Sequence, residues 1–253
     1  MRRLSALALA VLATAACDDT TTAPAVGPEA TTAAASRAAT GPAAAASYRV
    51  TVYNLSSGQP FTPPLAAVHR TSISLFEVGA PASVEIQEIA ENGNLAPMIA
   101  FASAAKHVKD AVVTEGPTLP PLLPGESVSF DIDGRTGAKY LSIVSMLICT
   151  NDGFTGVNSI RLPKRVGETT TVDAYGYDAG TEVNTEAWAD LVPPCAPLTG
   201  FDAMGAGTGM SDPTLTEDGV IRMHPGITGT GDLDPAVHGW TGAVARYEVE
   251  RIG

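Results

Sequence analysis

Hydrophobic and polar residues alternate in three well-separated segments of this chain. They are YRVTVYNL (48–55), SVSFDI (127–132) and VARYEVERI (244–252). A two-residue period places alternate side chains on opposite faces, so each segment predicts a half-buried β-strand. The residues expected to point inward include Tyr48, Val50, Val52, Val128, Phe130, Ile132, Ala245, Tyr247 and Val249.

A fourth segment, YLSIVSMLIC (140–149), is apolar almost throughout. Such a run predicts a central strand that is buried on both faces. VNSIRL (157–162) and ETTTVDAY (168–175) are further strand candidates, and ISLFEV (73–78) predicts a short strand or the lead into a helix.

Two helices are expected between the first strand and the central ones. Helix-forming residues follow Pro81 and stop at Asn92-Gly93, and a second, Ala-rich helix is expected over roughly 97–108. About seven short strands with two neighbouring helices predict a mainly β protein, an antiparallel β-sandwich with a short helical insertion.

The first 47 residues differ from the rest of the chain. Residues 1–17 combine Arg2 and Arg3, an apolar run and small residues before Cys17, which is the layout of a signal peptide. The end of this segment resembles a bacterial lipobox, in which Cys17 would be lipidated; an ordinary cleaved signal is the alternative. Residues 18–47 are rich in Thr, Ala and Pro and predict a disordered tether, leaving 48–253 as one domain. We therefore expect an exported protein that is secreted or held at the cell envelope.

Charge and cysteine content narrow the function further. The formal net charge is −12, which argues against a nucleic-acid partner because such a partner requires a basic face. With Cys17 assigned to lipidation, Cys149 and Cys195 remain, and in an oxidising compartment we expect them to form a disulfide. Two separate buried thiols are the alternative.

Two loops concentrate oxygen ligands suited to calcium. CTNDGFTG (149–156) contains Asp152 and is followed by Asn158, and YDAGTE (177–182) contains Asp178 and Glu182. Calcium prefers six to eight oxygen ligands, and loops at one end of a sandwich can supply them from separate strands. Clusters of Asp, Asn and Gly also form ordinary turns, so these residues alone leave both readings open.

The segment MHPGITGTGDLDPAVHGW (223–240) offers a different chemistry. Its two histidines and two aspartates could serve a metal-dependent envelope hydrolase, and an ordered loop with hydrogen-bonding histidines is the alternative. No GxSxG motif is present. The residues of the hydrolase hypothesis are His224, Asp232, Asp234 and His238.

The order of several motifs resembles the spondin N-terminal domain family. The similar segments are PPLAAVHRTS, then NDGFTGVNS (151–159), then YDAGTE, within a similar region of about 48–195. The resemblance implies a C2-like antiparallel β-sandwich with calcium bound at a loop end, and a role in adhesion rather than catalysis.

The resemblance also implies which residues would bind the ion. Asp152, Asp178 and Glu182 stand at acidic positions of the family motifs, and Glu126 is a looser match to a family acid. Asn158 replaces a family aspartate, and Gly153 replaces a tryptophan, so the calcium site is expected to carry less charge. In the first loop we expect Phe154 to be packed beneath the surface, and Gly153 and Gly156 to form the turn.

Together these observations predict a non-catalytic, calcium-binding module with a binding or adhesion role. Its partner would be an extracellular or envelope ligand that the sequence does not name, and contact with a membrane would be only through a lipid anchor.

Overall fold

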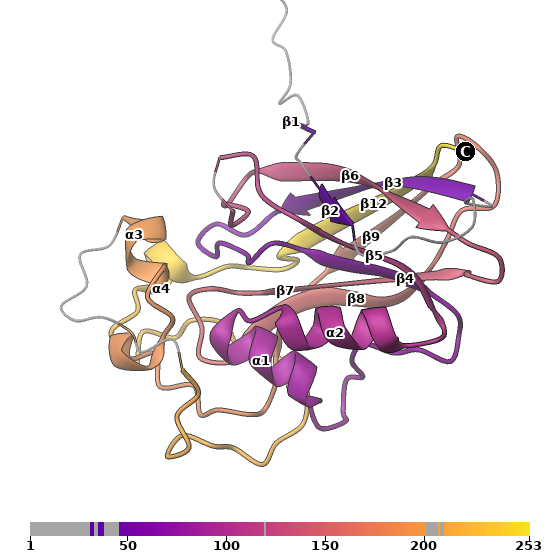
Figure 1. Cartoon of the computed structure of the whole chain (residues 1–253). Helices are drawn as coiled ribbons and strands as arrows, with labels where there is room; N and C mark the ends of the chain where they lie inside the picture. Colours follow the sequence, from indigo (N-terminus) through magenta and orange to yellow (C-terminus); the bar gives the residue numbers. More distant parts are fainter. Residues whose placement is uncertain (1–30, 33–34, 38–45, 119, 201–206, 208–209) are drawn as a thin grey trace, which may run out of the picture.

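Two β-sheets stack face to face in the computed structural model (Figure 1). The structure describes residues 31–32, 35–37, 46–118, 120–200, 207 and 210–253. The signal segment, Cys17 and most of the predicted tether lie outside the described residues. Within the tether, the structure places two very short strands, β1 and β2, at sheet edges, where an unpaired chain was expected.

The first sheet has five strands in the order β1-β6-β3-β12-β9. All its neighbouring pairs are antiparallel except β1 with β6. The C-terminal strand β12 lies between β3 and β9, so the last residues of the chain complete this sheet. Its strands are β1 (Thr31–Thr32), β3 (Ala46–Asn54), β6 (Ser127–Gly134), β9 (Thr169–Ala174) and β12 (Ala245–Arg251).

The second sheet has seven strands in the order β11-β10-β8-β7-β4-β5-β2, all antiparallel. The 4th of these, β7, is the apolar central strand that the sequence predicts, and it is buried along nearly its whole length. The strands are β2 (Ala35–Arg37), β4 (Leu65–His69), β5 (Val108–Thr114), β7 (Tyr140–Met146), β8 (Gly153–Arg161), β10 (Gly176–Asp178) and β11 (Arg222–Met223).

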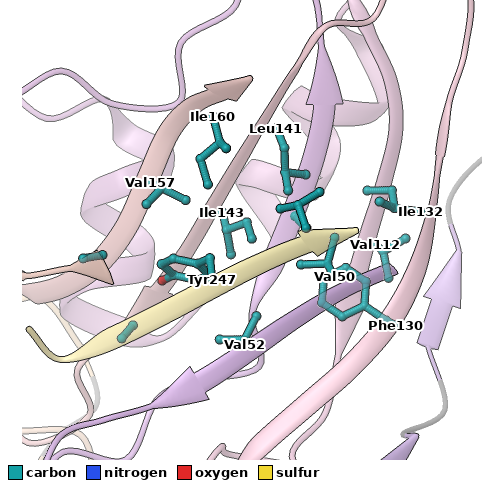
Figure 2. Packing of buried hydrophobic residues seen from close by; sticks show 14 of the residues in the cluster. Val50, Val52, Val112, Phe130, Ile132, Leu141, Ile143, Val157, Ile160 and Tyr247 are labelled. Atoms are coloured by element: carbon teal, nitrogen blue, oxygen red, sulfur yellow. The ribbon is translucent and has the colours of Figure 1, made fainter. Parts of the chain in front are cut away.

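The inward faces of the two sheets form the main core (Figure 2). Val50 and Val52 from β3 and Tyr247 from β12 are fully buried there, opposite Leu141 and Ile143 from β7. The alternation read from the sequence therefore places the correct residues inside, and the fold is the predicted mainly β sandwich.

Two helices, α1 (Val84–Asn92) and α2 (Ala96–Ala104), cover the outer face of the second sheet (Figure 1). Ser83 caps α1 by accepting a hydrogen bond from the Ile86 amide, and Gly93 ends it in the left-handed conformation at φ 64°. This second layer is why β7 is buried on both faces. Three short helical turns, η1 (Trp188–Asp190), α3 (Cys195–Thr199) and α4 (Pro235–His238), lie in the long C-terminal connections.

Residues 73–78 form neither the strand nor the helix lead that the sequence predicts. Their main chain bonds to a side chain instead of a strand: Leu75 N donates to Asn158 Oδ1, and Asn158 Nδ2 donates to Phe76 O. Leu75 and Phe76 are nevertheless buried in the second hydrophobic cluster, which also contains residues of α1.

Candidate functional site

The turn after β7 is built around a threonine and a glycine. Thr150 Oγ1 donates to Leu147 O at 2.6 Å and accepts from Gly153 N at 2.9 Å. A Cβ on Gly153 would lie 2.3 Å from that hydroxyl, so a side chain at this position would disrupt the turn. Gly153 closes this turn and is the first residue of strand β8, whereas Gly156 lies inside β8, which corrects the sequence prediction that both glycines form the turn.

A buried glutamine and a disulfide anchor the same turn from the other side. Gln59 Oε1 accepts from Cys149 N at 3.0 Å, and its Nε2 donates to His238 O at 2.6 Å. Cys149 and Cys195 form the predicted disulfide, with a Cα–Cα distance of 5.1 Å. The disulfide thus joins the end of the sandwich to the C-terminal connections.

Asp152, at the tip of this turn, is fully buried. Its Oδ2 accepts hydrogen bonds from Thr181 N at 2.8 Å and from Glu182 N at 3.1 Å. Among the described residues, Oδ1 has no hydrogen-bond partner. The two predicted loops therefore meet, because the first loop's aspartate binds the main chain of the second.

Asp178, at the end of β10, is also fully buried. Its Oδ1 accepts from Gly180 N at 2.8 Å, and its Oδ2 lies 2.7 Å from Asn184 Nδ2 and 3.1 Å from Arg222 Nη2. Gly180 has φ +70°, and a Cβ there would lie 2.7 Å from Val220 N. The Asp178 carboxylate therefore accepts a hydrogen bond from its own turn and also pairs with the Arg222 guanidinium.

Glu182 is a third buried acid, at 3 % exposure. We call Asp152, Asp178 and Glu182 the acidic cluster. Glu182 Oε1 accepts from Asp212 N at 2.8 Å. Burial, and then the carboxylates of Glu91, Asp152 and Asp190, raise the pKa of Glu182 from 4.5 to about 7, against the hydrogen bond from Asp212.

The cluster carries more negative charge than its nearest cation offsets. Burial first, and then the Asp178 carboxylate, raise the pKa of Asp152 from 3.8 to about 6, although three hydrogen bonds favour its ionised form. Arg222 pairs with Asp178 and also with Glu217, at 2.9 Å. Asp152 and Glu182 are therefore buried carboxyl groups that a cation or a proton would stabilise.

Comparison with known families identifies the chain at this point. The profile of the Spondin_N family matches residues 52–189, a range that includes both acidic loops. The chain belongs to the Spondin_N family. A search of curated protein sequences gives no match.

The match to Spondin_N ends before the last part of the fold. It covers the acidic cluster and the helical insertion, and it stops within η1. Strand β12, which lies in the centre of the first sheet, and Arg222, which pairs with Asp178, come after the matched range. Both belong to the sandwich of this chain but lie outside the range that the family match covers.

Asn158 does not join the acidic cluster. Its amide bonds to Ser74, Leu75, Phe76 and Ser142, which leaves it occupied with structural contacts. It lies where the β7–β8 register shifts, next to Ser159 at φ 63°, as in a β-bulge. The prediction of Asn158 as a metal ligand is not supported by these contacts.

Glu126 is also separate from the acidic cluster in its contacts. Its carboxylate accepts hydrogen bonds from Leu123 N, at 2.9 Å, and from the Thr118 hydroxyl. Both partners lie in the loop that precedes β6, so Glu126 holds that loop in place.

Glu186 is a buried acid whose role the sequence did not reveal. Its Oε1 accepts from Thr228 N and its Oε2 from Gly229 N and Thr230 N, at 2.6, 2.8 and 3.0 Å. Burial would raise the pKa of Glu186, but these hydrogen bonds outweigh it and lower the pKa. Glu186 thus fastens the glycine-rich 226–231 loop beside the acidic cluster. Its position in NTE (184–186), one residue after the YDAGTE loop, was the one available signal.

The residues of the hydrolase hypothesis have structural contacts. Asp232 Oδ2 accepts from Trp188 N at 3.0 Å, and Asp234 Oδ1 caps α4 by accepting from Ala236 N at 2.8 Å. His238 Nδ1 lies 3.1 Å from both the amide nitrogen and the carbonyl oxygen of Asp234. His224 is buried against Trp240, and burial lowers the pKa of His224 to about 4.

The distances between potential metal ligands also give no hydrolase metal centre among the described residues. In the described part of the chain, the one group with metal-like spacing is Cys149, Cys195 and His238, and its two sulfurs are joined as a disulfide. The four residues proposed for a hydrolase are therefore not gathered into one centre by the described fold.

Proposed function

We propose that this protein is an exported, non-catalytic Spondin_N binding module whose acidic loop cluster holds a calcium ion. Asp152 and Glu182 would provide ligand oxygens, and Asp178 would contribute if its contact with Arg222 loosened. Bound calcium would supply positive charge that holds the two acidic loops together at one end of the sandwich.

One observation carries the metal part of the proposal. Asp152 is fully buried, yet its Oδ1 has no hydrogen-bond partner among the described residues. A buried carboxylate oxygen without a partner is costly, so a ligand that satisfies it has a free-energy advantage. The raised pKa values of Asp152 and Glu182 indicate the same shortage of positive charge.

The fit to calcium depends on a small rearrangement. Carboxylate oxygens of Asp152, Asp178 and Glu182 do not all lie within 4.8 Å of one another in the described structure. Arg222 also occupies Asp178 Oδ2. Calcium would thus compete with Arg222 for Asp178, and removal of this arginine should strengthen calcium binding.

The disulfide and the family support the exported part of the proposal. Structural disulfides persist in oxidising compartments, and the Cys149–Cys195 disulfide is consistent with such a compartment. No helix among the described residues has the length and apolar character to cross a bilayer. Attachment to the envelope would be through lipidated Cys17, and the partner would be an extracellular or envelope ligand bound in an adhesive role.

Thermal melting with calcium or with a chelator tests the metal part of the proposal. A ligand that binds only the folded state raises Tm, so calcium should raise it in the natural protein. Asp152→Asn should abolish that shift. The control Asp131→Asn removes an exposed carboxylate that is paired with Arg49 and should leave the shift intact. Equal shifts in all three proteins, or no shift in the natural one, would reject a calcium site at this cluster.

A further inference from the structure

At the opposite end of the sandwich, cationic side chains surround a pocket of about 320 Å³. Strand β8 runs from Gly153, next to Asp152, to Arg161, which lines this pocket. At about 3.3 Å per residue, the two ends are about 25 Å apart. The C-terminus, which follows Arg251, lies at the end away from α3 and α4 (Figure 1).

Four of the chain's 15 Lys and Arg residues line this pocket. They are Lys139, Arg161, Lys164 and Arg251, and we call them the basic pocket. Tyr48 and Pro163 are among the other lining residues, and none of the described lining residues carries a carboxylate. This local concentration of positive charge contrasts with the net charge of the whole chain, which is −12.

The basic pocket has one fixed cation and three that have no bonded partner in the fold. Arg251 Nε donates to Gly253 O at 2.9 Å and Nη1 donates to Lys164 O, so its guanidinium is held in place. In the described part of the chain, the side chains of Lys139, Arg161 and Lys164 make no hydrogen bond or ion pair. By contrast, Arg49 and Arg246, on the sheet face, are each paired with an aspartate.

The Glu168 carboxylate, which interacts with Lys164, forms no ion pair with the basic pocket. Glu168 Oε2 accepts from the main-chain nitrogens of Lys164 and Arg165, at 2.9 and 3.0 Å, and these bonds, followed by the nearby cations, lower its pKa. Glu168 therefore orders the turn that presents Lys164, and it is not one of the pocket's lining residues.

We propose that the basic pocket binds a phosphate group. Arginine guanidinium groups bind phosphate oxygens through paired hydrogen bonds, and lysines add charge without directional demands. The pocket's volume lies at the lower limit of ligand sites, which suits a single headgroup or a small phosphorylated compound. The phosphate could belong to a soluble compound or to an anionic lipid headgroup.

Two binding measurements on the full chain distinguish these sources. Calorimetric titration with pyrophosphate at low salt measures the soluble form. Cosedimentation with phosphatidylcholine vesicles, with and without phosphatidylglycerol, measures the lipid form. Any lipid on Cys17 would insert into both kinds of vesicle, so the difference between them reports on the anionic headgroup alone.

The test variant is Arg161→Gln with Lys164→Gln, and the matched control is Arg49→Gln with Arg246→Gln. Both remove two cations, so both change the net charge equally. We expect the test variant to weaken phosphate binding at least about tenfold and the control to weaken it less than about twofold, because charge-assisted bonds act at contact distance. Loss in the pyrophosphate arm identifies a soluble ligand, and loss in the vesicle arm alone identifies a headgroup. No binding by the natural protein in either arm, or equal weakening by the two variants, overturns the proposal.

Discussion

The charged side chains at the two ends of the sandwich differ in burial and in bonded partners. At the acidic end, Asp152, Asp178 and Glu182 are buried and held by main-chain amides. At the other end, Lys139, Arg161 and Lys164 are exposed and have no bonded partner in the described fold. One end therefore has its charges built into the folded state, whereas the other displays them to solvent.

This difference separates stability from binding. A buried carboxylate that loses its partners costs free energy of folding, so changes at the acidic end should alter stability and cation binding together. Exposed cations contribute little to stability, so changes at the basic pocket should alter binding alone. Four predictions test this separation, in order of decreasing effect on stability.

Removal of the disulfide should have the largest effect. Cys149 and Cys195 are 46 residues apart, and closing a loop of that length stabilises a protein by about 4 kcal/mol in the chain-entropy account. Cys149→Ala with Cys195→Ala should lower the free energy of unfolding by about 2–4 kcal/mol, measured by urea denaturation. Hydrogen exchange should increase first around Asp152 and Gln59. Uniform loss of protection, equal at Arg161, would contradict a local anchor at the acidic end.

Two substitutions of Asp152 should differ from each other. Asp152→Ala leaves Thr181 N and Glu182 N without their acceptor and should cost about 2–4 kcal/mol in urea unfolding. Asp152→Asn keeps an acceptor oxygen and removes a charge close to Asp178, so it should be close to neutral without calcium. Equal destabilisation by both substitutions would show that the Asp152 charge itself is satisfied in the fold.

The pH dependence of stability should identify Glu182. Its pKa is about 7 in the folded state and near 4.5 when unfolded, so the folded state binds more protons between these values. Stability from this group is therefore present at low pH and is lost as pH rises towards 8. Asp152, with a pKa of about 6, acts in the same direction at lower pH.

The histidines act in the opposite direction, which makes a difference measurement necessary. Burial lowers the pKa values of His69, His224 and His238, so their contributions to stability rise with pH up to about 6.5. Subtracting the Glu182→Gln variant from the natural protein removes these shared terms. Without calcium, the difference in unfolding free energy should fall by about 1–3 kcal/mol between pH 5 and pH 8. A constant difference would mean that Glu182 ionises normally.

Most of the sandwich could be predicted from the sequence, because the two-residue alternation of hydrophobic and polar residues matches the two faces of a β-sheet. Val50, Tyr247 and Ile132 lie where the alternation placed them, and β7 is buried on both faces as its apolar run indicates. Strand β4 was missed because LAAVH, fully buried between β7 and β5, has no alternation to reveal it. Strand β5 was not predicted. The second helix was expected to continue to Val108, where β5 begins, but it ends at Ala104.

The contacts of the acidic cluster were less accessible to sequence reasoning. The two loops were expected together, and Asp152 does bind the main chain of the second loop. Arg222 was not foreseen, because it is 44 residues after Asp178 and reaches it through the pairing of β11 with β10. Asn158 as a calcium ligand stays a prediction. Its hydrogen bonds to the main chain of Leu75 and Phe76 could not be foreseen, because they depend on which distant segment packs against the bulge in β8.

The smallest effect on stability is expected at the basic pocket. Arg161→Gln with Lys164→Gln removes two exposed side chains that have no bonded partners in the described fold, so urea unfolding should change by less than about 0.5 kcal/mol. At low salt the variant should be slightly more stable than the natural protein, because it removes repulsion among the four cations of the basic pocket, and this gain should vanish at 1 M salt. Phosphate should stabilise the natural protein more than the variant, since it binds only the folded pocket. A loss of 2 kcal/mol or more on substitution would place these cations within the structural framework, and the contrast between the two ends would fail.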